Sequence, residues 1–93
     1  MLQQLRDEVR GTEDLTVGAG IDFADAVGVF EDDWALTLGE EVVQGEHRFA
    51  TAGADFLGRT AVVIYTYRGD DIRIISARPA TKAERGTYDE RRI

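Results

Sequence analysis

The sequence predicts an α+β fold: a compact antiparallel sheet of about four strands, with N-terminal helices and a basic C-terminal helix. Two observations support this prediction. Segments rich in β-branched and aromatic residues follow one another between Trp34 and Ala77, with short turns between them. Helical periodicity and capping signals lie before and after that region. The length of 93 residues is that of one domain, so residues 1–93 are predicted to form a single unit.

Two helices are predicted before the strands. Leucine and valine recur at helical spacing over residues 2–10, which favours a short helix there. Glycines weaken any regular element further on, so residues 1–20 are expected to be a flexible N-terminal segment. A second helix is predicted over residues 22–30, with Asp22 as its N-terminal cap. Four apolar residues at helical spacing should form its buried face: Phe23, Ala26, Val27 and Phe30.

Four strands are expected from alternating or continuous runs of strand-forming residues. The run 60–67 is apolar on both faces, which is typical of a central strand covered on both sides. Gly69 supplies the positive φ of a tight turn into the last strand, and residues 53–58 are expected to form a loop. The predicted strands are 34–43, 47–52, 60–67 and 72–77.

The chain is expected to end in a polar surface helix. Pro79 should end the last strand, because proline cannot donate a ladder hydrogen bond. Thr81 and Glu84 have the spacing of a capping box, in which each side chain accepts a hydrogen bond from the backbone N–H of the other residue. A helix is therefore predicted from Lys82 to about Arg91.

Charge is distributed unevenly along the chain. Residues 1–60 carry thirteen Asp and Glu against four Arg, whereas residues 61–93 carry seven Lys and Arg against five Asp and Glu. An acidic body disfavours non-specific nucleic-acid binding and suits a basic protein partner, so any polyanion should dock on the last third. No apolar run approaches the ~20 residues of a membrane span, and the start lacks the apolar core of a signal peptide. The absence of cysteine fits a cytoplasmic location.

Composition excludes several kinds of site. One histidine and no cysteine leave no His/Cys zinc site, and the sequence lacks a glycine-rich phosphate loop. No metal or cofactor is expected. The remaining candidate is a set of cations, most of them near the C-terminal end. These cations are Arg48, Arg73, Arg78, Lys82 and Arg85.

Such cations could serve a ribonuclease that uses no metal. Arginine binds phosphate bidentately and stabilises a developing dianion. The enzyme would also need groups that accept and donate protons, and Glu84, Tyr88, His47 or a lysine would have to serve. The same cations could instead keep a helix soluble or pair with neighbouring acids, and composition alone favours that simpler interpretation.

From Ile21 onward, the chain resembles the BrnT family, the toxin half of a type II toxin–antitoxin system. The resemblance covers about three-quarters of the chain, in order and with compatible spacing. Its most specific stretch is I-R-I-I-S-A-R-P-A-T over residues 72–81, which leads to Glu84, Arg85 and Tyr88. Other matching stretches are 21–30, 45–53, 62–66 and 68–69.

This resemblance implies a fold related to small bacterial ribonuclease toxins, and metal-independent RNA cleavage that inhibits translation and growth. It also implies a cognate antitoxin that wraps the toxin and binds operator DNA, so direct DNA binding by this chain is not expected. Arg73 and Arg78 would hold the scissile phosphate, and Arg48 would assist. Glu84 or Tyr88 would handle protons, and the RNA-binding residues would be Lys82 and Arg85.

The beginning of the chain departs from the family. Members carry a Lys-His-Gly step just before the segment that matches Ile21, and here that step is Gly18-Ala19-Gly20. A candidate acid–base group is therefore absent, and two other interpretations stay open. One is a catalytically weak or inactive toxin relative that acts as a protein-binding domain. The other is a small ligand-binding or structural domain outside any toxin system. An exposed edge at the first or fourth strand would permit self-association.

Overall fold

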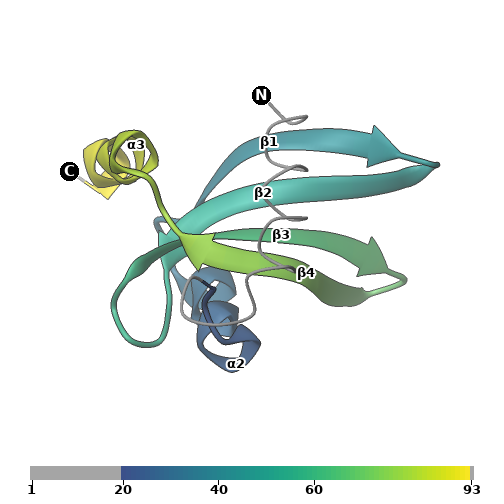
Figure 1. Ribbon diagram of the computed structural model, residues 1–93, viewed down its shortest axis with the longest axis horizontal. Coiled ribbons are helices and arrows are strands. Elements are labelled where there is room, and N and C mark those ends of the chain that lie inside the picture. The colour runs from purple at the N-terminus through teal and green to yellow at the C-terminus, as the bar shows by residue number, and fades with distance from the viewer. Residues whose placement is uncertain (1–19, 93) are drawn as a thin grey trace.

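The computed structural model describes residues 20–92. The predicted helix over residues 2–10 and the positions of Gly18 and Ala19 lie outside the described residues. The described elements form a four-stranded antiparallel sheet with short helices before it and one helix after it, which confirms the predicted α+β class (Figure 1). In chain order they are the helix α2 (Phe23–Ala26), the 3₁₀ helix η1 (Val27–Glu31), the strands β1 (Leu36–Val43), β2 (Glu46–Ala54), β3 (Thr60–Arg68) and β4 (Asp71–Pro79), and the helix α3 (Lys82–Arg92).

The sheet is a meander in which each strand pairs with the next one along the chain, in the order β1-β2-β3-β4. This order confirms that the edges are the first and fourth strands. Gly69 has a φ of 62° in the β3–β4 turn, as the sequence predicts. The predicted loop over residues 53–58 is wrong at its start, because β2 continues through Ala54 and pairs there with Thr60.

Strand β4 contains a bulge that changes which side chains share a face. Ile64 pairs with Ser76, but the next β3 residue, Tyr65, pairs with Ile74, so Ile75 is an extra residue. A bulge of this kind shifts the alternation of side chains by one position. As a result Arg73 and Arg78, five residues apart, lie on the same face of the sheet.

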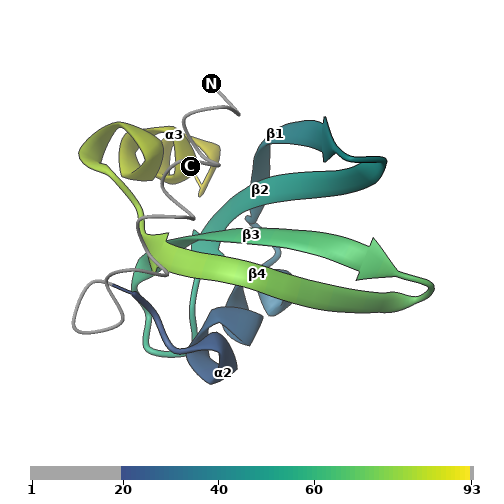
Figure 2. The same ribbon diagram turned by 45° about the vertical axis from the view of Figure 1, so that its right-hand side comes forward.

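The core occupies both faces of the sheet. Val63 and Tyr65 belong to a buried cluster on the face against which α2 and η1 pack, here called the α2 face. Val62 and Ile64 belong to a second cluster on the opposite face. Residues 61–66 of β3 are all buried, which confirms the prediction of a central strand. Figure 2 shows α2 and α3 on opposite sides of the sheet.

The predicted helix over residues 22–30 forms only in part. Asp22 caps it as expected, since its Oδ1 accepts a hydrogen bond from the backbone N–H of Ala24 at 2.9 Å. The α-helix ends at Ala26, and the chain continues as the tighter 3₁₀ helix η1. The predicted buried face is therefore wrong for Phe23 and Val27, which are 46% and 42% exposed. A 3₁₀ helix has three residues per turn, so the buried face shifts to Val29.

Gly28 explains how η1 reaches the sheet. A Cβ at this position would lie 2.5 Å from the backbone nitrogen of Phe56. The loop after β2 therefore packs directly on the helical backbone, and the Phe56 N–H donates to the carbonyl of Asp25 at 3.0 Å. Any larger residue at position 28 would force these segments apart.

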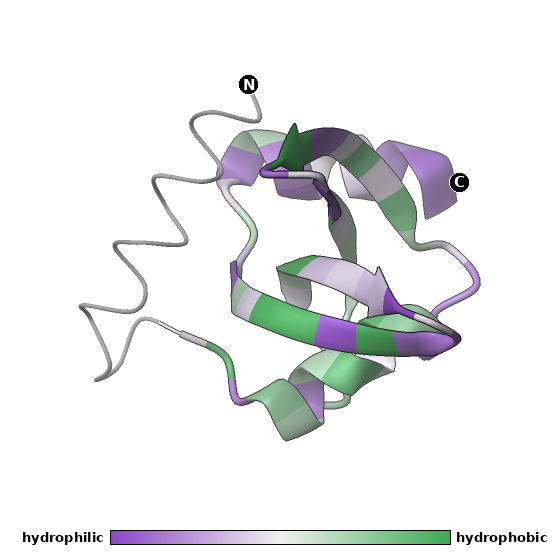
Figure 3. Cartoon of the chain, turned by 90° about the vertical axis from the view of Figure 1, so that its right-hand side faces the viewer, coloured by the Kyte–Doolittle hydropathy of each residue, from purple (hydrophilic) through white to green (hydrophobic). Residues whose placement is uncertain are grey.

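Helix α3 begins with the predicted capping box. The Thr81 N–H donates to Glu84 Oε1 at 2.9 Å, and the Glu84 N–H donates to Thr81 Oγ1 at 3.2 Å. Its surface is largely hydrophilic (Figure 3), but Tyr88 is buried. Among the helices of residues 20–92, none has the length and apolar character needed to cross a membrane.

Candidate functional site

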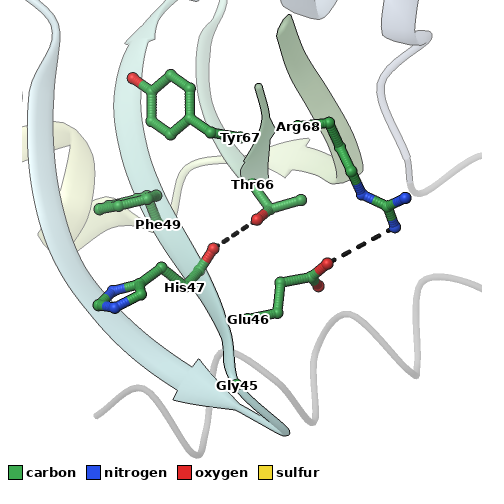
Figure 4. Close-up of a pocket in the computed structure, with 7 residues that line it drawn as sticks. All are labelled: Gly45, Glu46, His47, Phe49, Thr66, Tyr67 and Arg68. Atoms are coloured by element: carbon green, nitrogen blue, oxygen red, sulfur yellow. Dashed lines mark hydrogen bonds and ion pairs between the residues drawn. The ribbon is translucent and has the colours of Figure 1, made fainter. Parts of the chain in front are cut away.

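The two hairpins of the sheet separate at their tips. The β2–β3 ladder stops at the pair Phe49–Tyr65, although both hairpins continue to their turns. Beyond that pair, Thr66 Oγ1 donates to the carbonyl of His47 at 2.6 Å. The separation leaves an open space between β2 and β3, here called the aromatic cleft (Figure 4). Its lining residues are Gly45, Glu46, His47, Phe49, Thr66, Tyr67 and Arg68.

Beside the aromatic cleft, three arginines gather around one carboxylate. This arginine pocket has a volume of about 310 Å³ and lies on the face opposite to α2. Arg48 Nε donates to Glu46 Oε1 at 3.1 Å, and Arg68 Nη2 lies 3.7 Å from Glu46 Oε2. The pocket is completed by Thr66, Arg73, Ile74 and Ile75.

Arg73 supplies the surplus charge of the arginine pocket. Its side chain is exposed and has no hydrogen bond or ion pair within residues 20–92. The bulge at Ile75 places Arg73 opposite Thr66, and so on the same face as Arg48 and Arg68. Three guanidinium groups against one lining carboxylate can bind an anion, because an unpaired guanidinium offers forked donors to phosphate.

A second cluster, here called the helix junction, forms where β4 meets α3. Arg78 donates from Nη1 and Nη2 to the two carboxylate oxygens of Glu84, at 2.7 and 2.9 Å. Arg78 Nη1 also donates to the carbonyl of Pro79 at 3.2 Å. Hydrogen bonds from Arg78, opposed by partial burial, lower the pKa of Glu84 from 4.5 to about 2. Glu84 therefore stays ionised at neutral pH and carries no proton to donate.

The side chain of Tyr88, also on α3, is almost fully buried. Its hydroxyl donates a short hydrogen bond to Asp32 Oδ2, which also accepts from the backbone N–H of Ala54 at 2.8 Å. Burial, followed by the bond to Asp32, raises the pKa of Tyr88 to about 12. Burial also raises the pKa of Asp32, but the hydrogen bonds from Tyr88 and the backbone outweigh it, and the net pKa is lowered. The pair ties α3 to the segment before β1.

The site residues predicted from sequence thus fall into separate places. Arg48 and Arg73 are brought together in the arginine pocket, and Arg78 and Glu84 in the helix junction. The partners of Arg73 and Arg78 on β3 are four residues apart, which corresponds to roughly 13 Å along the strand. Tyr88 is buried against Asp32, while the side chains of Lys82 and Arg85 are exposed on α3.

Sequence reasoning missed two residues of the arginine pocket, Glu46 and Arg68. Arg68 is the last residue of β3 and has the same strand parity as Thr66. Glu46 stands two residues before Arg48, so strand alternation places both on one face. That alternation is the signal that could have found Glu46. Within residues 20–92, no group of His, Asp and Glu is arranged to hold a metal ion.

Most of the chain matches a model of a known protein family. The model of a family described as "Ribonuclease toxin, BrnT, of type II toxin-antitoxin system" matches residues 18–84. This range includes the whole arginine pocket and the helix junction up to Glu84. A search of curated proteins found no match to the chain.

Proposed function

Because this chain belongs to the BrnT family of type II ribonuclease toxins, we propose that it is a metal-independent endoribonuclease that inhibits translation and growth. Membership of the family also implies an antitoxin partner. The observation that carries the proposal is the arginine pocket, where Arg48, Arg68 and Arg73 converge beside Glu46. A ribonuclease without a metal must stabilise the charge that develops on the phosphate with side chains, and three guanidinium groups can supply that stabilisation.

In this proposal RNA is the substrate, and Arg48 and Arg73 hold the scissile phosphate. Glu46 takes the proton of the 2′-hydroxyl while the 2′ oxygen forms a bond to phosphorus. The bond from phosphorus to the 5′ oxygen breaks, and the leaving oxygen takes a proton from the now protonated Glu46 or from water. Strand termini carry these groups, so each is held by the sheet and not by a loop.

Glu46 fits the role of proton acceptor better than the residues proposed from sequence. Glu84 commits both oxygens to Arg78, and Tyr88 is buried with a pKa of about 12. In contrast, Glu46 is 30% exposed and faces the pocket. Arg78 lies roughly 13 Å further along the sheet, and Lys82 and Arg85 follow it on α3, so we do not assign them to the same phosphate. We assign them to phosphates further along the RNA.

An RNA cleavage assay in EDTA tests the proposal. The purified protein should cleave a fluorescently labelled single-stranded RNA, and Arg73→Ala should lower the rate roughly 10²- to 10³-fold, the usual loss for one stabilising donor. Arg91→Ala is the matched control, because it removes another exposed arginine, in the last turn of α3, to which no RNA contact is assigned. The rate of this control should change less than about threefold.

Glu46→Gln provides a second arm of the assay. Loss of the proton acceptor should lower the rate roughly 10²- to 10⁴-fold, with no loss of the fold by circular dichroism. An Arg73→Ala protein that cleaves at the wild-type rate would remove the arginine pocket from the proposal. Loss of activity in Arg78→Ala but not in Arg73→Ala would move the site to the helix junction.

A second candidate function is a toxin relative with weak or no catalysis that acts by binding protein. The glycine and alanine at positions 18 and 19 and the acidic first sixty residues favour it. It predicts no RNA turnover by a folded wild-type protein that still binds a basic antitoxin tightly. Robust cleavage in EDTA would contradict it. Cytoplasmic location and self-association through an edge strand, β1 or β4, stay predictions.

A further inference from the structure

The aromatic cleft has two chemically different sides. His47, Phe49 and Tyr67 present their rings on one side, and Glu46 and Arg68 lie on the other (Figure 4). The volume of about 440 Å³ falls within the ~300–1,000 Å³ of small-ligand pockets. The cleft exists because the β2–β3 ladder stops at Phe49, so no neighbouring strand fills it.

The rings form one continuous cluster that is open to solvent. The centroids of His47 and Phe49 are 6.3 Å apart with nearly parallel planes, and Tyr67 meets Phe49 edge to face at 5.6 Å. Tyr67 is 53% exposed, and its hydroxyl has no hydrogen bond within residues 20–92. A single exposed tyrosine is ordinary. Three adjoining rings around an open cleft form a stacking platform.

The aromatic cleft and the arginine pocket adjoin each other. They share Glu46, Thr66 and Arg68 as lining residues. The rings belong to the α2 face and the arginines to the opposite face, so a ligand with its phosphate on the arginines would reach the rings through the gap between β2 and β3, with the group attached to that phosphate. For a single-stranded nucleic acid, that group is a sugar carrying an unstacked base.

We infer that the aromatic cleft binds one unstacked base of single-stranded RNA, next to the phosphate held in the arginine pocket. This inference rests on the proposed function and adds a base-binding subsite to it. Aromatic rings stack on the face of any base, so the subsite should favour single strands over duplexes and discriminate weakly among bases. Arg68 faces both spaces and would keep the phosphate and the base in register.

The test compares a short RNA oligomer carrying 2′-O-methyl groups, which cannot be cleaved, with an abasic oligomer that has the same phosphates. Fluorescence anisotropy gives the affinity of each. The wild type should bind the base-containing oligomer more tightly, and Tyr67→Ala should lose roughly 5- to 100-fold of that affinity. Affinity for the abasic oligomer should not change, whereas Arg73→Ala should weaken binding of both oligomers.

Two variants serve as controls. Tyr67→Phe keeps the ring and should retain wild-type binding, which shows that stacking and not the hydroxyl is needed. Phe56→Ala removes a ring of matched exposure, 55%, in the loop between β2 and β3 and should have no effect. Circular dichroism of each variant establishes that it is folded.

Several outcomes would overturn the inference without touching the proposed function. One is an equal loss of affinity for both oligomers in Tyr67→Ala. Another is unchanged RNA binding in Tyr67→Ala together with loss of antitoxin binding, which would assign the cleft to a protein partner. Equal affinity of the wild-type protein for the two oligomers would also contradict the inference. The proposed function would fail separately, through unchanged cleavage in Arg73→Ala.

Discussion

The arginine pocket and the helix junction are both built from arginine and glutamate, but only in the helix junction are the two kinds of charge matched in number. At the helix junction, Arg78 gives both forks of its guanidinium to Glu84, and the side chains are 12% and 19% exposed. In the arginine pocket, Glu46 meets Arg48 at 3.1 Å and Arg68 only at 3.7 Å, and Arg73 has no partner within residues 20–92. An arginine that is fully paired with a carboxylate, as in the helix junction, stabilises the fold. The arginines that outnumber the carboxylate of the arginine pocket are available to bind an anion.

The largest effect that would test this contrast is the loss of folding stability expected in Arg78→Ala. The substitution leaves Glu84 partly buried without its main partner and should lower the free energy of unfolding by roughly 2–3 kcal/mol. The full value for a buried pair is not expected, because both side chains keep some contact with water. Urea denaturation gives the measurement. Arg73→Ala is the matched control and should change stability by less than about 0.5 kcal/mol. Equal losses of stability in the two variants would contradict the contrast between the helix junction and the arginine pocket.

The pH dependence of stability sharpens the same comparison. The pKa of Glu84 is lowered from 4.5 to about 2 in the folded chain, so its contribution is complete above pH 4.5 and is lost as pH falls toward 2. The free energy of unfolding of wild type should therefore exceed that of Glu84→Gln by roughly 2 kcal/mol at pH 7, and the two values should converge as pH falls toward 2. The pKa of Asp32 is also lowered, but Asp32 is present in both proteins, so its contribution cancels in the difference between them. A constant difference across this range would show that the charge of Glu84 is not what stabilises the helix junction.

The smallest effect is expected at Tyr88. Tyr88→Phe removes the hydroxyl that donates to Asp32 but keeps the buried ring, so the free energy of unfolding should fall by about 1–2 kcal/mol. Thermal unfolding of Tyr67→Phe supplies the control, since that hydroxyl has no partner among the described residues. If Tyr88→Phe were as stable as wild type but inactive on RNA, the residue would return to the list of proton carriers.

The strands and the last helix were predictable because their signals are local. Alternation, the glycine of the β3–β4 turn and the capping box at Thr81 each specify the backbone within a few residues. The helix over residues 22–30 was predicted wrongly in its second half, because its geometry depends on a distant contact. The loop backbone at Phe56 packs against Gly28, and a pattern of helical spacing carries no information about that approach.

The grouping of the arginines could not be predicted from the sequence, for a related reason. Arg48 and Arg73 lie on strands that do not pair with each other, and their shared face depends on the register of β3 between them. If Ile75 paired with Tyr65 instead, Arg73 would project from the α2 face. The sequence shows the arginines but not the bulge, so their division into two clusters could not be predicted from it.

The bulge at Ile75 makes the register of β4 a determinant of the site. If the end of β4 slid by one position so that Ile75 paired with Tyr65, every side chain between Ile75 and the turn would change sides. Arg73 would move to the aromatic side, and Ile72 and Ile74 would face the remaining arginines. Deleting Ile75 would remove the bulge without this slide, because Ile74 would still pair with Tyr65 and Arg73 with Thr66. A relative that lacks this one residue would therefore keep both the fold and the pocket.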